Sequence, residues 1–96
     1  MKRIELLYLS QEDVISVGIT MTETIPIVED AIREHGLGET ENPPKPGIHP
    51  RKAFIHAMPG YLPRKKAAGL KWVSSFSNNT ALALPPAMGL FILTKV

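Results

Sequence analysis

One stretch decides the fold: residues 69–79, with the sequence GLKWVSSFSNN. It reads as an apolar strand that carries one cation and ends in a polar turn. Successive side chains of a strand point to opposite faces. Lys71 therefore shares a face with Val73, and Trp72 points to the other face. A lysine on such a face is at least half buried, and a buried ammonium is costly unless it meets an anion. The anion is a protein carboxylate or a ligand; the alternative is a lysine whose aliphatic stem reaches water.

The composition describes one small domain over residues 1–96, with an ordinary hydrophobic content of 44%. A net charge of +2 gives no ground for a nucleic-acid or membrane partner. The absence of cysteine excludes disulfides and thiolate metal sites. Glu5 interrupts the apolar residues behind the basic N-terminus, so there is no signal peptide, and no apolar run reaches membrane-spanning length. We therefore expect a soluble cytoplasmic protein.

The N-terminal part predicts a short strand followed by a short helix. Residues 3–9 (RIELLYL) alternate with a period near two, as in a strand. Ser10 and Asp13 have the spacing of a capping box, and Gly18 is a typical residue after a helix end. A helix of about two turns is expected between Ser10 and Gly18.

A longer helix is expected next. Its cap is assigned to Thr22 or Thr24, which places Pro26 in the first turn, where a missing N–H costs nothing. Gly36 is the expected end of this helix. The following residues, up to 52, are rich in proline and predict an extended segment with a short strand near 45–49.

Three further strands are predicted at 53–58, 69–76 and 87–94. Pro59-Gly60 is a strong turn signal after the first of them. The order of strand, two helices and then strands favours an α+β fold, in which the first strand and the helices pack on a mainly antiparallel sheet. Because residues 87–94 are the most apolar strand and lie at the end of the sequence, we expect the sheet to complete itself by dimerisation.

Cations outside residues 69–79 offer weaker site candidates. Lys45 lies in the proline frame PPKPG and is either a solvated loop lysine or a rigidly held anion ligand. His49, Arg51 and His56 do not have the spacing of a metal site, and no carboxylate lies near them in sequence, so we reject a metal. The chain shows no glycine-rich phosphate loop and no nucleophile elbow, so it lacks the parts of a complete active site.

Several short motifs occur in the order and spacing of a known family. They are Leu7-Tyr8-Leu9-Ser10, the segment PPKP at 43–46, Ala57-Met58-Pro59-Gly60-Tyr61, Gly69-Leu70-Lys71-Trp72-Val73-Ser74, Asn79, Leu84-Pro85 and Gly89-Leu90-Phe91-Ile92-Leu93. Together they resemble the N-terminal part of the ornithine cyclodeaminase/mu-crystallin family, and the resemblance covers nearly the whole chain. The family includes amino-acid and ketimine oxidoreductases such as an archaeal-type alanine dehydrogenase.

The resemblance implies an NAD(P)-dependent, dimeric parent enzyme, in which this segment binds substrate and dimerises and a Rossmann domain follows. It implies that Lys71 contacts the substrate carboxylate and assists the chemistry. Lys45 falls where many members have a carboxylate-binding arginine, and an ammonium lacks the bidentate fork of that guanidinium. Met58 matches a methionine lining the substrate pocket, and Asn79 matches the asparagine of the loop after the lysine strand.

Other positions depart from the family pattern. Ser77 stands where the family loop usually has proline, and residues 81–83 replace a usually basic stretch. The family's nucleotide loop and catalytic aspartate have no counterpart within residues 1–96. The resemblance therefore implies a truncated substrate-binding portion without a nucleotide-binding domain, inactive alone, which holds an amino or imino acid. The alternative is a small non-catalytic module that associates with itself through residues 87–94.

Overall fold

The computed structural model describes residues 1–96 and divides them into two compact units, Met1–Asp30 and Ala31–Val96. The first unit holds an extended N-terminal segment, helix α1 and most of helix α2. The second holds the end of α2 and a four-stranded sheet. Each unit is described by itself below.

Helix α1 spans Gln11–Val17 and confirms the expected capping box. The Ser10 hydroxyl accepts a hydrogen bond from the Asp13 N–H at 3.2 Å, and the Asp13 carboxylate accepts one from the Ser10 N–H at 2.8 Å. Gly18 ends the helix in the left-handed conformation at φ 73°, which glycine adopts without steric cost. The strand predicted at 3–9 does not form, because residues 1–10 have no hydrogen-bonded partner strand within the chain.

Helix α2 spans Met21–Gly36 and begins earlier than predicted. The Thr20 hydroxyl accepts from the Glu23 N–H at 3.2 Å and donates to the Glu23 carboxylate at 3.0 Å, so Thr20 acts as the cap in place of Thr22 or Thr24. Pro26 consequently lies inside the helix. Because only the first four N–H groups of a helix lack partners, Pro26 costs one backbone hydrogen bond there.

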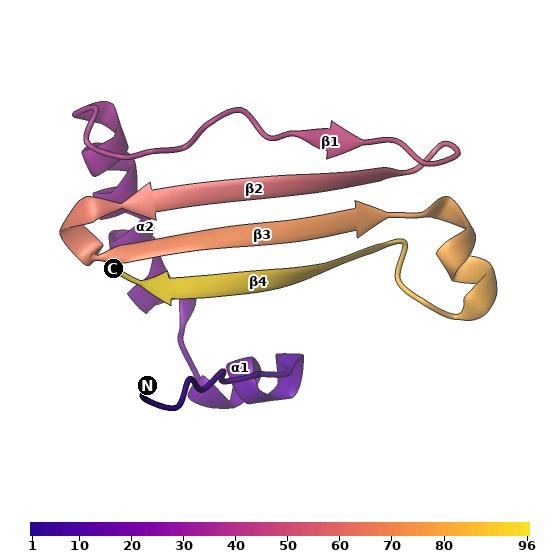
Figure 1. Cartoon of the computed structure of the whole chain (residues 1–96), viewed down its shortest axis with the longest axis horizontal. Coiled ribbons are helices and arrows are strands. Elements are labelled where there is room, and N and C mark those ends of the chain that lie inside the picture. The colour runs from indigo at the N-terminus through magenta and orange to yellow at the C-terminus, as the bar shows by residue number, and fades with distance from the viewer. The chain divides into compact units, whose positions relative to one another are not determined.

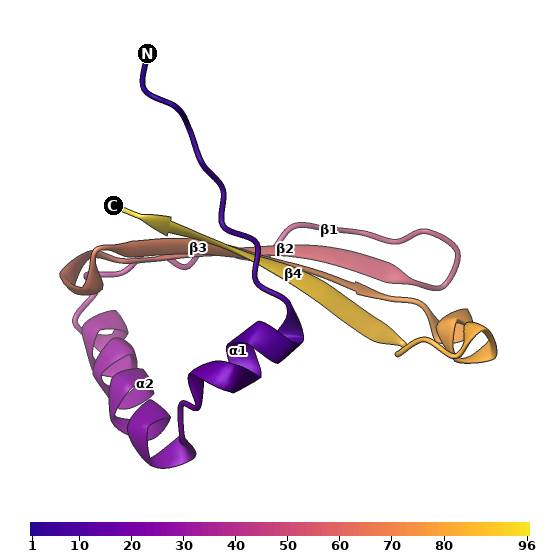
Figure 2. The ribbon, with the colours of Figure 1, turned by 90° about the horizontal axis from the view of Figure 1, so that it is seen from below.

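The sheet contains four strands in the order β1-β2-β3-β4, all antiparallel, which confirms the α+β class (Figure 1). The strands are β1 (Gly47–Ile48), β2 (Phe54–Leu62), β3 (Ala67–Ser75) and β4 (Ala87–Lys95). Figure 2 shows this sheet nearly edge-on, with β4 rotated relative to β3, as expected for the natural twist of strands.

Pro59-Gly60 does not form the predicted turn, because both residues lie inside β2 and pair with Leu70 and Gly69. The N–H groups of Ala57 and Tyr61 bond to Pro46 and Glu41, so odd-numbered residues of β2 direct their backbone groups away from β3. Pro59 lies between them, and its missing N–H therefore takes nothing from the β2–β3 ladder. The chain reverses later, in the 3₁₀ helix Pro63–Lys65.

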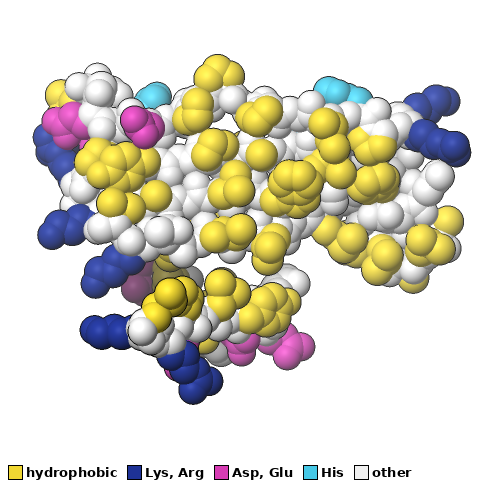
Figure 3. Space-filling view, in the orientation of Figure 1, with side chains coloured by type: hydrophobic (Ala, Val, Ile, Leu, Met, Phe, Trp, Pro, Cys, Tyr) yellow, Lys and Arg dark blue, Asp and Glu magenta, His cyan; other side chains and the backbone are white.

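The register divides the side chains between two faces of the sheet. We call the first the Lys71 face; its central members are His56, Met58, Gly60, Gly69, Lys71, Val73, Gly89, Phe91 and Leu93. The opposite Trp72 face is apolar at its centre: Ile55, Ala57, Pro59, Leu70, Trp72, Leu90 and Ile92. Figure 3 shows hydrophobic side chains spread over one face of the sheet, with dark blue only towards its ends.

The outer side of β4 is a long open edge of the sheet. Beside β3, the Val96 N–H donates to the Lys66 carbonyl and the Phe76 N–H donates to the Pro86 carbonyl, which fixes the even-numbered pairs as the bonded ones. Odd-numbered residues of β4, such as Phe91 and Leu93, therefore direct their N–H and C=O groups to the open edge.

Little apolar surface is buried within the chain. Ala53, at 8% exposure, is its one buried hydrophobic residue. On the sheet, the side chains of Trp72, Leu90 and Phe91 are 46%, 52% and 62% exposed. The faces of the sheet therefore have apolar surface that a covering partner could bury.

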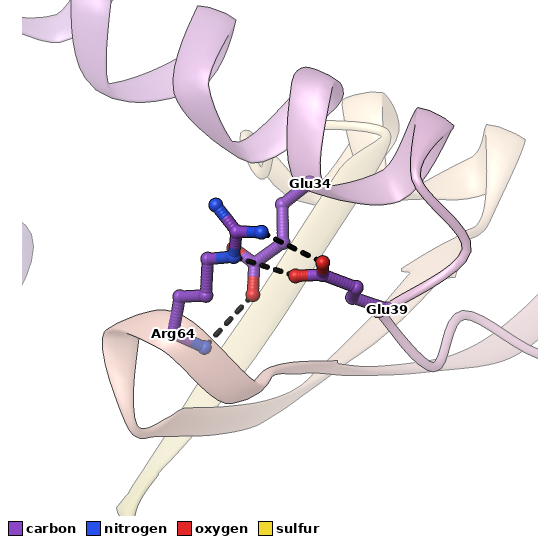
Figure 4. A network of polar contacts seen from close by, with 3 residues as sticks. All are labelled: Glu34, Glu39 and Arg64. Atoms are coloured by element: carbon purple, nitrogen blue, oxygen red, sulfur yellow. Dashed lines mark hydrogen bonds and ion pairs between the residues drawn. The ribbon is translucent and has the colours of Figure 1, made fainter.

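A polar cluster holds the β2–β3 turn to the last turn of α2 and to the segment that follows it (Figure 4). The Glu34 carboxylate, on a residue only 3% exposed, accepts the backbone N–H of Arg64 at 2.8 Å. The Arg64 guanidinium donates two hydrogen bonds to the Glu39 carboxylate, one of 2.7 Å from Nη2. A bidentate pair of this kind is stronger than a single ionic contact because two N–H groups share the charge.

Candidate functional site

Lys71 lies at the centre of β3, directly opposite Met58 of β2 and Phe91 of β4. Directly opposed residues share a face, so Lys71, Met58 and Phe91 are cross-strand neighbours on one face of the sheet. Lys71 is exposed and takes part in no ion pair or hydrogen bond within the chain. Both interpretations drawn from the sequence therefore remain: the Lys71 ammonium is accessible to water, and it is accessible to an anionic ligand.

Lys45 reaches the same region of the sheet from the segment before β1. The Pro46 carbonyl accepts a hydrogen bond from the Ala57 N–H at 3.1 Å. Pro46 therefore lies beside Ala57, and the residue before it lies beside Met58. Lys45 is exposed and has no carboxylate partner within the chain. The structure thus brings the backbones of three predicted site residues, Lys45, Met58 and Lys71, into one cross-strand row.

Glycines surround this row on the Lys71 face. Gly60 and Gly69 oppose each other one step from the row, and Gly89 lies one step away on the other side. The edge of the Phe91 ring fills the space above Gly69, since a Cβ there would come within 2.9 Å of two of its ring atoms. A side chain at position 69 would thus displace the Phe91 ring, and one at position 89 would meet the Trp72 carbonyl oxygen at 2.9 Å.

Asn79 is not brought to this row. It lies in the 3₁₀ helix Ser77–Leu82, beyond the end of β3. Its side-chain amide donates to the Pro85 carbonyl at 3.1 Å, which closes the loop between β3 and β4. In this structure Asn79 therefore shapes that loop and does not contact Lys71.

The charges of the chain are divided along the sequence. All nine acidic residues precede Asn42, as do three of the eleven basic ones, Lys2, Arg3 and Arg33. Residues 42–96 thus carry eight Lys or Arg side chains and no Asp or Glu. The overall net charge of +2 hides this division, which was readable in the sequence. The sheet offers no carboxylate of its own to Lys45 or Lys71.

The chain contains neither a cluster of metal-ligand side chains nor a parallel βαβ unit. No group of three or more His, Cys, Asp or Glu side chains is gathered anywhere in the chain. A Rossmann-type dinucleotide site is built on a parallel βαβ unit with a glycine-rich turn before its helix, whereas every strand pair here is antiparallel. None of the helices has the length and apolar character required to cross a membrane.

The α+β architecture and the lysine-bearing strand β3 agree with the family that the sequence motifs resemble. The chain belongs to the ornithine cyclodeaminase/mu-crystallin family, which it matches over residues 5–96. This confirms the family resemblance of the sequence motifs.

Among curated relatives, the nodulation efficiency protein NfeD of Rhizobium meliloti is 48% identical over 87 residues, which are 90% of this chain and 27% of that protein. The alanine dehydrogenase of Archaeoglobus fulgidus is 42% identical over 91 residues, which are 95% of this chain and 27% of that enzyme. The chain thus spans about a quarter of the length of these relatives.

Solved structures agree with this assignment. An archaeal alanine dehydrogenase dimer with bound NAD superposes with a TM-score of 0.80 and 41% identity, over 88% of this chain and 26% of that one. The Δ(1)-pyrroline-2-carboxylate reductase of Thermococcus litoralis, in complex with NADH and L-proline, superposes with a TM-score of 0.74 and 34% identity, over 80% and 24%.

Proposed function

We propose that residues 1–96 form the substrate-binding and dimerisation portion of an NAD(P)-dependent enzyme that acts on an amino or imino acid, as an oxidoreductase or a cyclodeaminase. The observation that carries the proposal is the row of Lys45, Met58 and Lys71 on a sheet that has no carboxylate. Two relatives support the substrate class: one is an alanine dehydrogenase, and the other has L-proline bound.

In this proposal the two lysines hold the substrate carboxylate. Lys71 donates from β3 and Lys45 from the far side of Met58, so the carboxylate lies over the thioether. Met58 supplies an apolar, adaptable wall for the substrate carbon chain. Fixing the carboxylate at two points orients the bonds at the α-carbon before any reaction occurs. Asn79 acts indirectly, by holding the β3–β4 loop through Pro85.

NAD(P) belongs to the full-length parent in this proposal. Residues 1–96 contain no parallel βαβ unit to receive it, so we expect this chain alone to bind no dinucleotide and to be inactive. Cofactor-dependent turnover by purified 1–96 would contradict this part of the proposal.

Self-association is the second part of the proposal. The open edge of β4 and the exposed apolar side chains of the sheet favour pairing with a second copy. A non-catalytic self-associating module would share this property but would have no use for the two lysines. Ligand binding at Lys71 therefore separates the two functions.

The test is an NMR titration of backbone amides with L-alanine, L-proline, L-ornithine and L-lysine. We expect at least one of them to shift the amides of Met58 and Lys71. Lys71→Met keeps the aliphatic stem and removes the charge, and we expect it to weaken binding by about tenfold, the usual size of a charged hydrogen bond.

Lys95→Met is the matched control, because it removes the same charge from the end of β4. Equal affinity losses in the two variants would show only a general charge effect and would contradict a carboxylate site at Lys71. No binding by any of the four amino acids would favour the non-catalytic module.

A further inference from the structure

His56 occupies a defined place on the Lys71 face. It pairs with Val73 across β3, so it is the diagonal neighbour of Lys71, a relation that separates Cα atoms by roughly 7–8 Å. Its ring leans the other way, over Gly47 of β1, where a Cβ would meet the ring's Cδ2 at 2.5 Å. A glycine at position 47 is therefore what makes room for this imidazole.

Two aromatic contacts hold the ring there. Phe54 stacks on it with centroids 4.4 Å apart and an interplanar angle of 24°. His49 meets it edge-on, with centroids 6.2 Å apart and an angle of 75°. Two imidazoles are thus gathered at one place, although seven positions separate them in sequence.

Neither imidazole donates a hydrogen bond within the chain, and no carboxylate lies in the whole of residues 42–96. His56 is only partly exposed, whereas His49 is exposed. His49 and His56 therefore have N–H groups on the Lys71 face that are available to a ligand. Stacking on Phe54 explains where the His56 ring lies, but it does not require a histidine.

We propose that His49 and His56 form a second anion subsite, which receives the side-chain carboxylate of a dicarboxylic amino or imino acid whose α-carboxylate is held at Lys71. The inference rests on the proposed function for Lys71 and adds the substrate class. The α-carboxylate lies over Met58, and the substrate side chain runs from there along β2 towards His56. Imidazole N–H groups suit this role because they donate directional hydrogen bonds to carboxylate oxygens.

Other uses of the pair fit the structure less well. A structural metal needs four ligands and a catalytic one usually three, whereas this group holds two imidazoles and no third ligand. The donors are few and lie beside an apolar methionine, which suits one carboxylate joined to a carbon chain. Free phosphate shares the anion chemistry and is separated from the proposal by experiment.

The test compares L-glutamate with L-glutamine by NMR, following backbone amides around Lys71 and the ring signals of the two histidines. The two ligands have the same shape and differ in one charge. We expect both to shift the Lys71 region, glutamate to bind about tenfold tighter, and only glutamate to shift the histidine rings. His56→Phe keeps a flat ring over Gly47 and removes the N–H, so it should abolish the preference for glutamate.

His49→Gln provides a second variant at an exposed position, and it should reduce the preference without altering the fold. If both ligands shift Lys71 equally and leave the histidine rings unchanged, the subsite is wrong and the proposed function stands. If neither ligand shifts Lys71, the subsite is wrong, and the proposed function is decided by the titration with the other four amino acids. If inorganic phosphate shifts the rings as strongly as glutamate does, also in Lys71→Met, the pair is a general anion site and the subsite is again overturned.

Discussion

Glu34 and Glu39 belong to one polar cluster, but their carboxylates bind different groups of Arg64. Glu34 is buried and accepts a backbone N–H, so it fixes the position of the β2–β3 turn whatever side chain follows at residue 64. Glu39 is exposed and depends on the Arg64 guanidinium itself. Removing the Arg64 side chain therefore affects one carboxylate and spares the other.

The pH dependence of stability should reveal this difference. The hydrogen bonds from Arg64, aided by its charge, hold the pKa of Glu39 below its ordinary value of 4.5, against a smaller opposing effect of burial. A carboxyl with a lowered folded pKa stabilises the fold fully above its ordinary value, and this contribution is lost as the pH falls through the folded value. Arg64→Gln should return the pKa of Glu39 towards 4.5 and reduce stability at neutral pH but not in strong acid.

Carbon-detected NMR titration of the Glu39 carboxyl checks the first expectation, and urea unfolding at several pH values checks the second. Lys66→Gln is the matched control, because it removes one positive charge from the same turn without touching Glu39. An unchanged Glu39 titration midpoint in Arg64→Gln would contradict the assigned cause.

At the level of elements, the start of α2 offers a sharp comparison. The Thr20 hydroxyl accepts the cap bond from the Glu23 N–H and donates to the Glu23 carboxylate, whereas Thr22 lies within the helix. Thr20→Ala should lower the free energy of unfolding by about 1 kcal/mol, and Thr22→Ala should change it little. Urea unfolding followed by far-UV circular dichroism measures both free energies. Equal decreases in the two variants would contradict the assignment of the cap to Thr20.

Local signals predicted the elements that depend on neighbouring residues. The Ser10–Asp13 capping box, Gly18 and the helix end at Gly36 needed no distant contact, and all three were confirmed. Pro59 was misread because its tolerance depends on which way its nitrogen faces. That direction follows from the bonds of Ala57 and Tyr61 to a distant segment.

The candidate site was predictable only in part, for the same reason. Lys71 and Met58 were named from sequence motifs, and their pairing followed once β2 and β3 were in register. His56 was considered only as a metal ligand and rejected, so the anion subsite proposed above was not anticipated. Its place follows from the pairing of Gly47 with His56, a contact that no local pattern encodes.

On the scale of the whole molecule, exposed apolar surface is the main feature. Large apolar side chains are exposed on both faces of the sheet, among them Trp72, Leu90 and Phe91, and exposed apolar patches mark interaction surfaces. The open edge of β4 is one place where a second copy could pair by backbone hydrogen bonds.

Two proline variants test that edge. The Leu93 N–H faces the open edge, so Leu93→Pro should abolish self-association while leaving the fold intact. Ile92 pairs with Leu70 through the β3–β4 ladder, so Ile92→Pro should unfold that strand pair. Sedimentation velocity and circular dichroism report the two outcomes. A folded Leu93→Pro protein that still associates would move the interface elsewhere, most simply to the Trp72 face.

Trp72 has a further consequence for work in solution. It is the chain's single tryptophan, and it lies 46% exposed between Ala57 and Leu90 at the centre of an apolar face. Tryptophan emission depends on the exposure of the indole to water. The intrinsic fluorescence of this protein therefore reports whether the Trp72 face of its sheet is covered. No label is needed to tell whether that face or only the β4 edge is covered when copies of the chain meet.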